Sequence, residues 1–199
     1  MYLTYYKPTD IEIWINQQYQ SSGIHYASEL DLDRIADLFG IELHIYDGKS
    51  FADWKDDSHR FILLNISLQP AQRRAEFFHE LCHPLRHVGN QDGMGKLFKE
   101  LQEIQATQFQ YYAAMPFYML EEFKDISPSL LVKTMAEEFM LPDRFVERRL
   151  DQVKRRLQMG RQDAELNERM KTPVKVDMAH VRRVMEEFGR KQRERQGAY

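Results

Sequence analysis

The sequence predicts an α+β fold that is mostly helical, with a small antiparallel or mixed sheet near the N-terminus packed on a helical core. An alternation of apolar and polar residues over 41–46, followed by two short β-rich runs, indicates the sheet. Apolar residues at three- and four-residue steps in much of the remaining chain indicate amphipathic helices. With 199 residues, 43% of them hydrophobic, the chain is long enough for one good core and a small appendage.

The N-terminal part is expected to contain two helices and three strands, at residues 9–20, 30–39, 41–46, 51–54 and 61–66. The first helix begins with a capping-box pattern in which Thr9 is followed three residues later by Glu12. Gly40 is a typical C-terminal stop for the second helix.

A third helix is expected over residues 71–83, and it carries the sequence H-E-x-x-H. His79 and His83 stand four residues apart, so both imidazoles point to the same side of a helix, as two nitrogens must to bind one Zn²⁺. Glu80 lies about 100° round the helix, where a general base can reach a water beside the metal. The alternative is an exposed helix with two ordinary histidines. Pro84 predicts a kink or a stop directly after the motif.

Four further helices are expected, at residues 96–115, 130–139, 144–157 and 178–189. The candidate core residues of the first of these are Leu97, Leu101, Ile104, Phe109 and Tyr112. Residues 159–175 are expected to be loose and polar. Residues 130–157 therefore pair two helices about a short turn, in the manner of a helix-turn-helix.

A catalytic zinc site needs a third protein ligand and an open position for water. The downstream candidates are His87, Glu100, Glu103, Glu121 and Glu122. Spacing alone does not choose among them, because the third ligand meets the other two only in the folded chain.

Three blocks within about residues 60–150 resemble the ImmA/IrrE family of zinc-dependent metallopeptidases. Residues 62–87 resemble the family's strand and HELGH helix with its following histidine. Residues 103–116 resemble the family's E-x-x-A-N-x-F-A-x-x-L-L-M-P helix, and residues 135–150 its closing helix-turn-helix-like pattern. The chain departs from the family pattern at Cys82, which replaces glycine, at Thr107 and at Gln110.

The resemblance implies that His79, His83 and Glu103 bind Zn²⁺ and that Glu80 is the catalytic base. Glu100 is then a fallback ligand or an outer partner of the site, and His87 either supports a ligand or closes the helix. Cys82, three residues after His79, is expected to be a small packed hydrophobe rather than a ligand. The implied organisation is a zincin-like metallopeptidase domain over residues 1–126 and a helical C-terminal region over 127–199.

The family also implies a substrate. Its members resemble regulators of prophages and other mobile elements that cut a partner repressor at one place. The expected activity is therefore limited, site-specific cleavage of a cognate helix-turn-helix transcriptional repressor. One cysteine and the absence of any apolar run of about 20 residues favour a cytoplasmic protein without a membrane partner.

The charge distribution supports a rival hypothesis. Residues 144–199 carry a net charge of +7 and residues 1–143 a net charge of −10. The helix over 143–157 is rich in arginine, so the chain could instead be a DNA-binding regulator whose metal site is structural or inactive. The alternative is that these basic residues only form a solvated helical surface and bind no anionic partner. The departures at Cys82 and Pro84 also keep open a metal-binding scaffold without activity.

Overall fold

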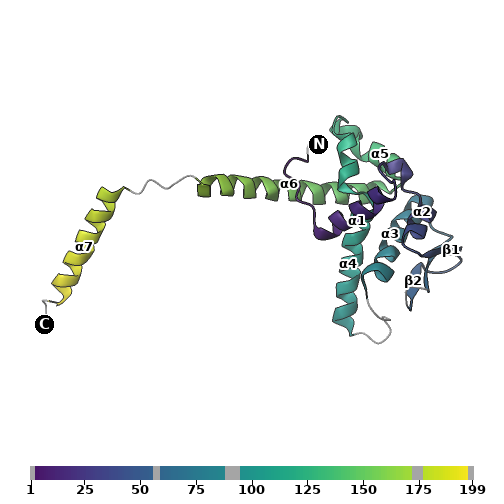
Figure 1. The fold of residues 1–199 in the computed structure, drawn as a ribbon, viewed down its shortest axis with the longest axis horizontal. Coiled ribbons are helices and arrows are strands. Elements are labelled where there is room, and N and C mark those ends of the chain that lie inside the picture. Colours follow the sequence, from purple (N-terminus) through teal and green to yellow (C-terminus); the bar gives the residue numbers. More distant parts are fainter. Residues whose placement is uncertain (1–2, 56–58, 88–94, 172–176, 197–199) are drawn as a thin grey trace. The chain divides into compact units, whose positions relative to one another are not determined.

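The computed structural model describes residues 3–55, 59–87, 95–171 and 177–196 (Figure 1). The chain divides into two compact units, Met1–Gly160 and Arg161–Tyr199, and each is described by itself. The first unit contains the sheet, most of the helices and the buried core. The second contains the distal part of a long helix and one further helix.

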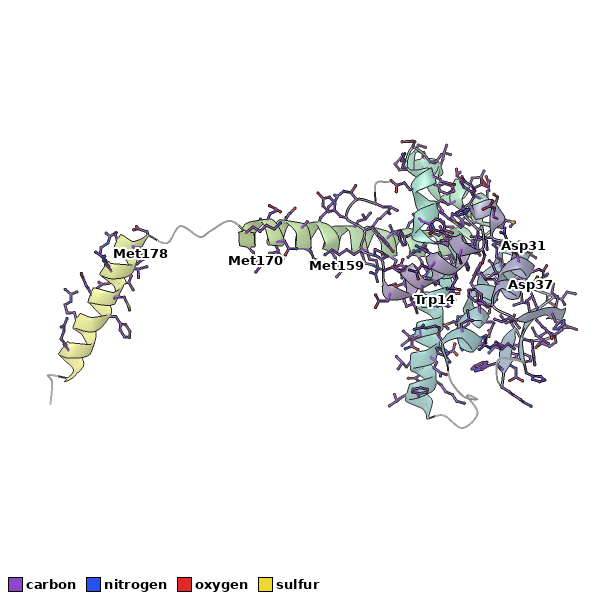
Figure 2. The ribbon with its side chains drawn as sticks, in the orientation of Figure 1. Trp14, Asp31, Asp37, Met159, Met170 and Met178 are labelled. Atoms are coloured by element: carbon purple, nitrogen blue, oxygen red, sulfur yellow. The ribbon has the colours of Figure 1, made fainter. Side chains whose placement is uncertain are left out.

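The N-terminal segment forms two α-helices and a short 3₁₀ helix, which are α1 (Asp10–Ser21), η1 (Ala27–Glu29) and α2 (Leu32–Leu38). The predicted capping box is present at α1: the Glu12 backbone N–H donates to Thr9 Oγ1 at 3.2 Å, and the Thr9 N–H donates to the Glu12 carboxylate at 2.8 Å. At α2 the N-cap residue is Asp31 (labelled in Figure 2), whose carboxylate accepts a single hydrogen bond from the Arg34 backbone N–H at 2.9 Å. Gly40 follows α2 with a φ of 63°, a left-handed conformation that glycine adopts without strain.

Three strands form one mixed sheet, as the sequence predicted. They are β1 (Glu42–Tyr46), β2 (Phe51–Trp54) and β3 (Arg60–Asn65), in the spatial order β1-β3-β2. β3 pairs parallel with β1 and antiparallel with β2. The order leaves β2 at one edge of the sheet, and α3 packs against both β2 and β3.

Two long helices, α3 (Pro70–Arg86) and α4 (Lys96–Ala114), pack against each other at the centre of the unit. Of the kink or stop expected at Pro84, the stop is wrong, because α3 continues through this residue to Arg86, and the kink stays a prediction. Proline removes only one backbone donor, and the next turn is still held by the His87 N–H, which donates to the His83 carbonyl at 3.0 Å.

The described residues of the C-terminal part form helices separated by short turns, namely η3 (Phe117–Phe123), α5 (Pro128–Phe139), α6 (Asp143–Lys171) and α7 (Met178–Gln196). Met140 ends α5 in a left-handed conformation with a φ of 52°, and the Leu141 N–H then donates to the Ala136 carbonyl at 3.0 Å. This residue takes the place that glycine usually fills in such a turn.

Two sequence expectations for the helices are wrong. Residues 159–171 are not loose but continue α6, since Gln, Arg, Glu, Leu and Met in this segment are all good helix formers; residues 172–175 lie outside the described residues. In α4, Phe109 and Tyr112 are buried, but Leu97, Leu101 and Ile104 are exposed, because the outer face of this half of α4 has no neighbour in the described core.

The buried core of the first unit joins all of its layers. Its largest buried apolar side chains include Tyr19 from α1, Ile62 and Leu64 from β3, Phe77 and Phe78 from α3, Phe109 from α4 and Phe139 from α5. Trp14 on α1 stacks on Phe39 with ring centroids 5.6 Å apart (Figure 2). Among the described residues, no helix has the length and apolar character that a membrane crossing requires.

Candidate metal centre

The α3–α4 pair places the residues of the candidate site. His79, Glu80 and His83 lie on α3, and Glu103 lies on α4, which packs along α3. The helical spacing of α3 points both imidazoles to one side, and helix packing supplies the carboxylate from 24 residues away in the sequence.

Three potential ligand atoms meet at this point. His79 Nε2 lies 3.2 Å from Glu103 Oε2, and His83 Nε2 lies 3.8 Å from Glu103 Oε1. One donor atom from each of His79, His83 and Glu103 lies within 4.8 Å of the others, close enough for all three to hold one metal ion. Of the five third-ligand candidates that spacing left open, Glu103 is the one that joins this cluster among the described residues.

The surroundings of His83 favour the neutral imidazole that a metal requires. Burial, together with the neighbouring imidazoles of His79 and His87, lowers the pKa of His83 to about 4 against the opposing charge of Glu103. The Trp54 ring of β2 stacks over His83 with centroids 6.1 Å apart and an interplanar angle of 17°. The packing of α3 and β2 therefore fixes the orientation of this ring.

Glu80 lies beside the two histidines and is itself buried. Burial, together with the charges of Glu76 and Glu103, raises the pKa of Glu80 to about 7, although the Ala52 backbone N–H donates to its carboxylate and Lys49 opposes the rise. A carboxyl group with a pKa near neutrality can both accept and deliver a proton, which is the property a general base needs.

These side chains line a cleft of about 700 Å³. Residues 49–54, which include the whole of β2, form one wall, and His79, Glu80, His83, Glu103 and Gln110 are also among its lining residues. Sequence reasoning missed Trp54 and Gln110 as site residues. No sequence signal identified Trp54, whereas the departure of Gln110 from the family pattern was the available sign.

His87 and Glu100, the two outer candidates, have different positions. His87 is buried, and its Nδ1 atom lies 3.0 Å from His83 Nδ1. Glu100 pairs with Lys96 at 3.9 Å on the exposed surface of α4 and does not join the described cluster of ligand atoms. Cys82 is buried as predicted, and burial raises the pKa of its thiol to about 12, so the thiolate that metals bind is disfavoured.

The arginine-rich helix is less available for DNA than its composition suggested. Arg149, one of its six basic residues, is fully buried and forms an ion pair with Glu12 at 2.8 Å. Arg156 donates to the Lys7 carbonyl at 3.0 Å. The remaining four basic residues, Arg144, Arg148, Lys154 and Arg155, are exposed but are interspersed with the exposed acidic residues Glu147 and Asp151. The DNA-binding alternative is therefore not favoured.

The donor set suits a divalent transition metal of the zinc type. Two neutral imidazoles and one carboxylate are a ligand combination that catalytic zinc sites use, and three protein ligands leave a further position open. The Glu103 side chain is 50% accessible and lines the cleft, so the third ligand position is open to the cleft.

The α+β fold and the cluster of two histidines and one glutamate define a candidate metal-binding protein. Comparisons with known proteins identify its family. Residues 35–151 match the Peptidase_M78 family, described as an IrrE N-terminal-like domain. The chain therefore belongs to the ImmA/IrrE family, as its three sequence blocks predicted.

Two relatives come from Bacillus subtilis (strain 168). The chain is 35% identical to the phage-like element PBSX protein XkdA over 147 residues, which cover 73% of this chain and 74% of the relative. It is 26% identical to the uncharacterized protein YqaB over 153 residues, covering 76% and 88% of the two chains.

A solved structure of a Mycobacterium tuberculosis transcriptional regulator has a similar fold, with a TM-score of 0.50 and 16% sequence identity. The match covers 70% of this chain and 46% of the regulator, so this chain spans less than half the length of that structure.

Proposed function

We propose that this protein is a zinc-dependent metallopeptidase that cuts a cognate helix-turn-helix transcriptional repressor at one place. The observation that carries the proposal is the meeting of His79, His83 and Glu103 beside the buried Glu80. Membership of the Peptidase_M78 family supports peptidase chemistry. The name of the XkdA relative, a protein of a phage-like element, supports a place for this protein on a mobile element.

In this mechanism His79, His83 and Glu103 would hold the zinc ion. When bound, zinc supplies Lewis acidity, which makes water more acidic and stabilises negative charge on a carbonyl oxygen. Glu80 takes the proton from the attacking water and then delivers it to the amine that leaves. The Ala52 backbone N–H donates to the Glu80 carboxylate and so holds this group at the cleft.

The substrate segment is proposed to bind in extended form along β2. This strand lies at the edge of the sheet, and all of its residues line the cleft beside the ligands. An extended peptide can add itself to such an edge through backbone hydrogen bonds, while side-chain contacts supply the preference for sequence. This geometry favours cleavage in a flexible loop or linker of the repressor over cleavage within its folded helices.

The test is incubation of the zinc-loaded protein with the repressor encoded beside it, followed by mass spectrometry of the products. We expect a single cut that stops on chelation and returns on addition of zinc. Glu80→Gln should keep its zinc and slow the cut by about 10²- to 10⁴-fold, because only the proton acceptor is lost. An intact repressor, or a cut that persists undiminished in Glu80→Gln, would refute the assignment.

A further inference from the structure

His87 has a contact that the proposed mechanism does not use. Its ring is 5.0 Å from the His83 ring between centroids, and the two Nδ1 atoms are 3.0 Å apart. His87 is one of the few buried polar residues of the first unit, with 6% of its surface exposed. The contact therefore joins a buried imidazole to Nδ1 of His83, the ring nitrogen opposite the Nε2 atom that faces Glu103.

The two nitrogens of His83 have separate neighbours. Nε2 faces the Glu103 carboxylate at 3.8 Å, on the side where the three ligand atoms meet, and Nδ1 faces His87. A neutral imidazole carries one proton, and only the nitrogen without it can bind a metal. Nε2 can thus be a ligand only when the proton is on Nδ1.

The short contact between the two Nδ1 atoms links the position of the proton on His83 to the position of the proton on His87. If His83 Nδ1 carries a proton, it donates to His87 Nδ1, which must then be the unprotonated acceptor. The proton of His87 is then on Nε2, which is buried and has no acceptor at normal hydrogen-bond geometry among the described residues, although the Gln105 side chain interacts with this ring. The tautomers of the two rings are therefore linked, and only the pairing with the His83 proton on Nδ1 gives His83 Nε2 the lone pair that a metal ligand needs.

We propose that His87 is a positioning residue that holds the proton of His83 on Nδ1 and so prepares Nε2 as a metal ligand before the metal arrives. The inference rests on the zinc site of the proposed function and extends it to a residue that contacts neither metal nor substrate. Metal-binding histidines usually donate their second nitrogen to a carboxylate or a carbonyl; here an imidazole is the acceptor.

Two substitutions separate this role from simple packing. His87→Leu keeps an apolar side chain of similar size in the buried site but removes the acceptor. His87→Asn leaves a smaller side chain whose amide oxygen can accept the proton of His83 Nδ1. A positioning role predicts that Asn is tolerated better than Leu, whereas a packing role predicts the opposite order. His44→Ala, at an exposed histidine of β1, is the control for loss of an imidazole.

Zinc affinity is measured first, by competition with a chelator. We expect His87→Leu to bind zinc about 10- to 100-fold more weakly than the wild type, and His87→Asn and His44→Ala to remain within a few-fold of it. Thermal unfolding of each metal-free variant shows whether the fold is kept. Wild-type affinity in a folded His87→Leu protein would overturn the proposal.

The second readout is the tautomer itself, which the nitrogen chemical shifts of ¹⁵N-labelled histidine report in the metal-free wild-type protein at neutral pH. We expect the His83 proton on Nδ1 and the His87 proton on Nε2. A His83 proton on Nε2 would overturn the proposal even if every variant failed to fold. Neither readout uses peptidase activity, so a protein that binds zinc with the expected tautomers but cuts nothing refutes the proposed function and not the role of His87.

Discussion

Glu100 and Glu103 stand one turn apart on the same exposed stretch of α4, yet only Glu103 contacts the histidines. A difference of three residues rotates a helical side chain by about 60°, which is enough to turn Glu103 toward α3 and Glu100 toward Lys96. The identity of the third ligand therefore depends on the rotation of one helix about its axis.

This pair gives a matched prediction for metal content. Glu103→Ala should lose most of its zinc after dialysis because one of three protein ligands is gone, whereas Glu100→Ala should keep the wild-type stoichiometry. Elemental analysis of the purified variants measures both, with His79→Ala as the expected zinc-free reference. Zinc retained by Glu103→Ala and lost by Glu100→Ala would reassign the ligand.

Glu12 provides a second prediction at the residue scale, outside the site. Its burial would raise the pKa of the carboxyl group, but the charge of Arg149 and hydrogen bonds from Tyr6 and Thr9 outweigh burial and lower the pKa below the ordinary 4.5. A carboxyl group whose pKa is lower in the folded chain stabilises the fold at pH values above its unfolded pKa, and this stabilisation is lost as the pH falls through the folded value.

The free energy of unfolding of the wild type should therefore exceed that of Glu12→Gln at pH 7. We expect the gap to close as the pH falls below about 4.5, where protonation makes Glu12 resemble the amide. Urea unfolding at a series of pH values measures it. A gap that stays constant down to pH 3 would mean that the charge of Glu12 does not stabilise the fold.

At the scale of elements, α6 connects other helices of the first unit through a buried arginine, a function that its basic composition did not predict. Arg149 reaches from α6 to α1, where it contacts Glu12, and it also donates to the Met115 carbonyl at 3.1 Å after the end of α4. Its guanidinium lies over the Tyr112 ring, 5.0 Å from the centroid. One buried side chain thus connects three helices of the first unit.

Removing this side chain leaves Glu12 as a buried charge without its cation. Arg149→Ala is expected to lower the free energy of unfolding by about 3–5 kcal/mol, because breaking one side of a buried ion pair is costly. Its exposed neighbour is the control, and Arg148→Ala should change stability by less than about 0.5 kcal/mol. Denaturant titration compares the two. Equal effects would show that position 149 is not the buried junction described here.

At the scale of the molecule, every described residue of the candidate site belongs to the unit Met1–Gly160. The described residues that line the cleft all have numbers between 49 and 110 and so also belong to this unit. Its apolar side chains on α7, Val181, Val184, Met185 and Phe188, are exposed, as is Met170 on α6 (Figure 2). The division of the sequence at residue 126 stays a prediction, whereas the compact unit itself continues through α5 to Gly160.

A chain that ends at Gly160 should consequently keep its zinc site. We expect zinc affinity within a few-fold of the full-length protein and a thermal unfolding midpoint within a few degrees, since the buried core lies in the retained part. A chain ending at Pro142 loses Arg149 and should unfold at a clearly lower temperature. Loss of zinc binding in the longer chain would assign residues 161–199 a part in forming the site.

The local features of this protein could be predicted from the sequence because each depends on neighbours a few residues away. The capping box at Thr9 and the side-by-side placement of His79 and His83 follow from helix geometry alone. The strand at residues 41–46 follows from its alternation. The same local reasoning failed at Pro84 and over residues 159–171, where hydrogen bonds of the next turn and good helix formers continue the helices.

The amino-acid sequence by itself determined the family, the helix with its two histidines and the acidic residue between them. Only the tertiary structure decided that Trp54 stacks over His83, that His87 Nδ1 lies 3.0 Å from His83 Nδ1 and that Arg149 is buried against Glu12, which lies 137 residues away in the chain. The physical reason is that periodicity fixes the face on which a side chain lies, whereas the partner of that face is chosen by the packing of all the helices and the sheet together.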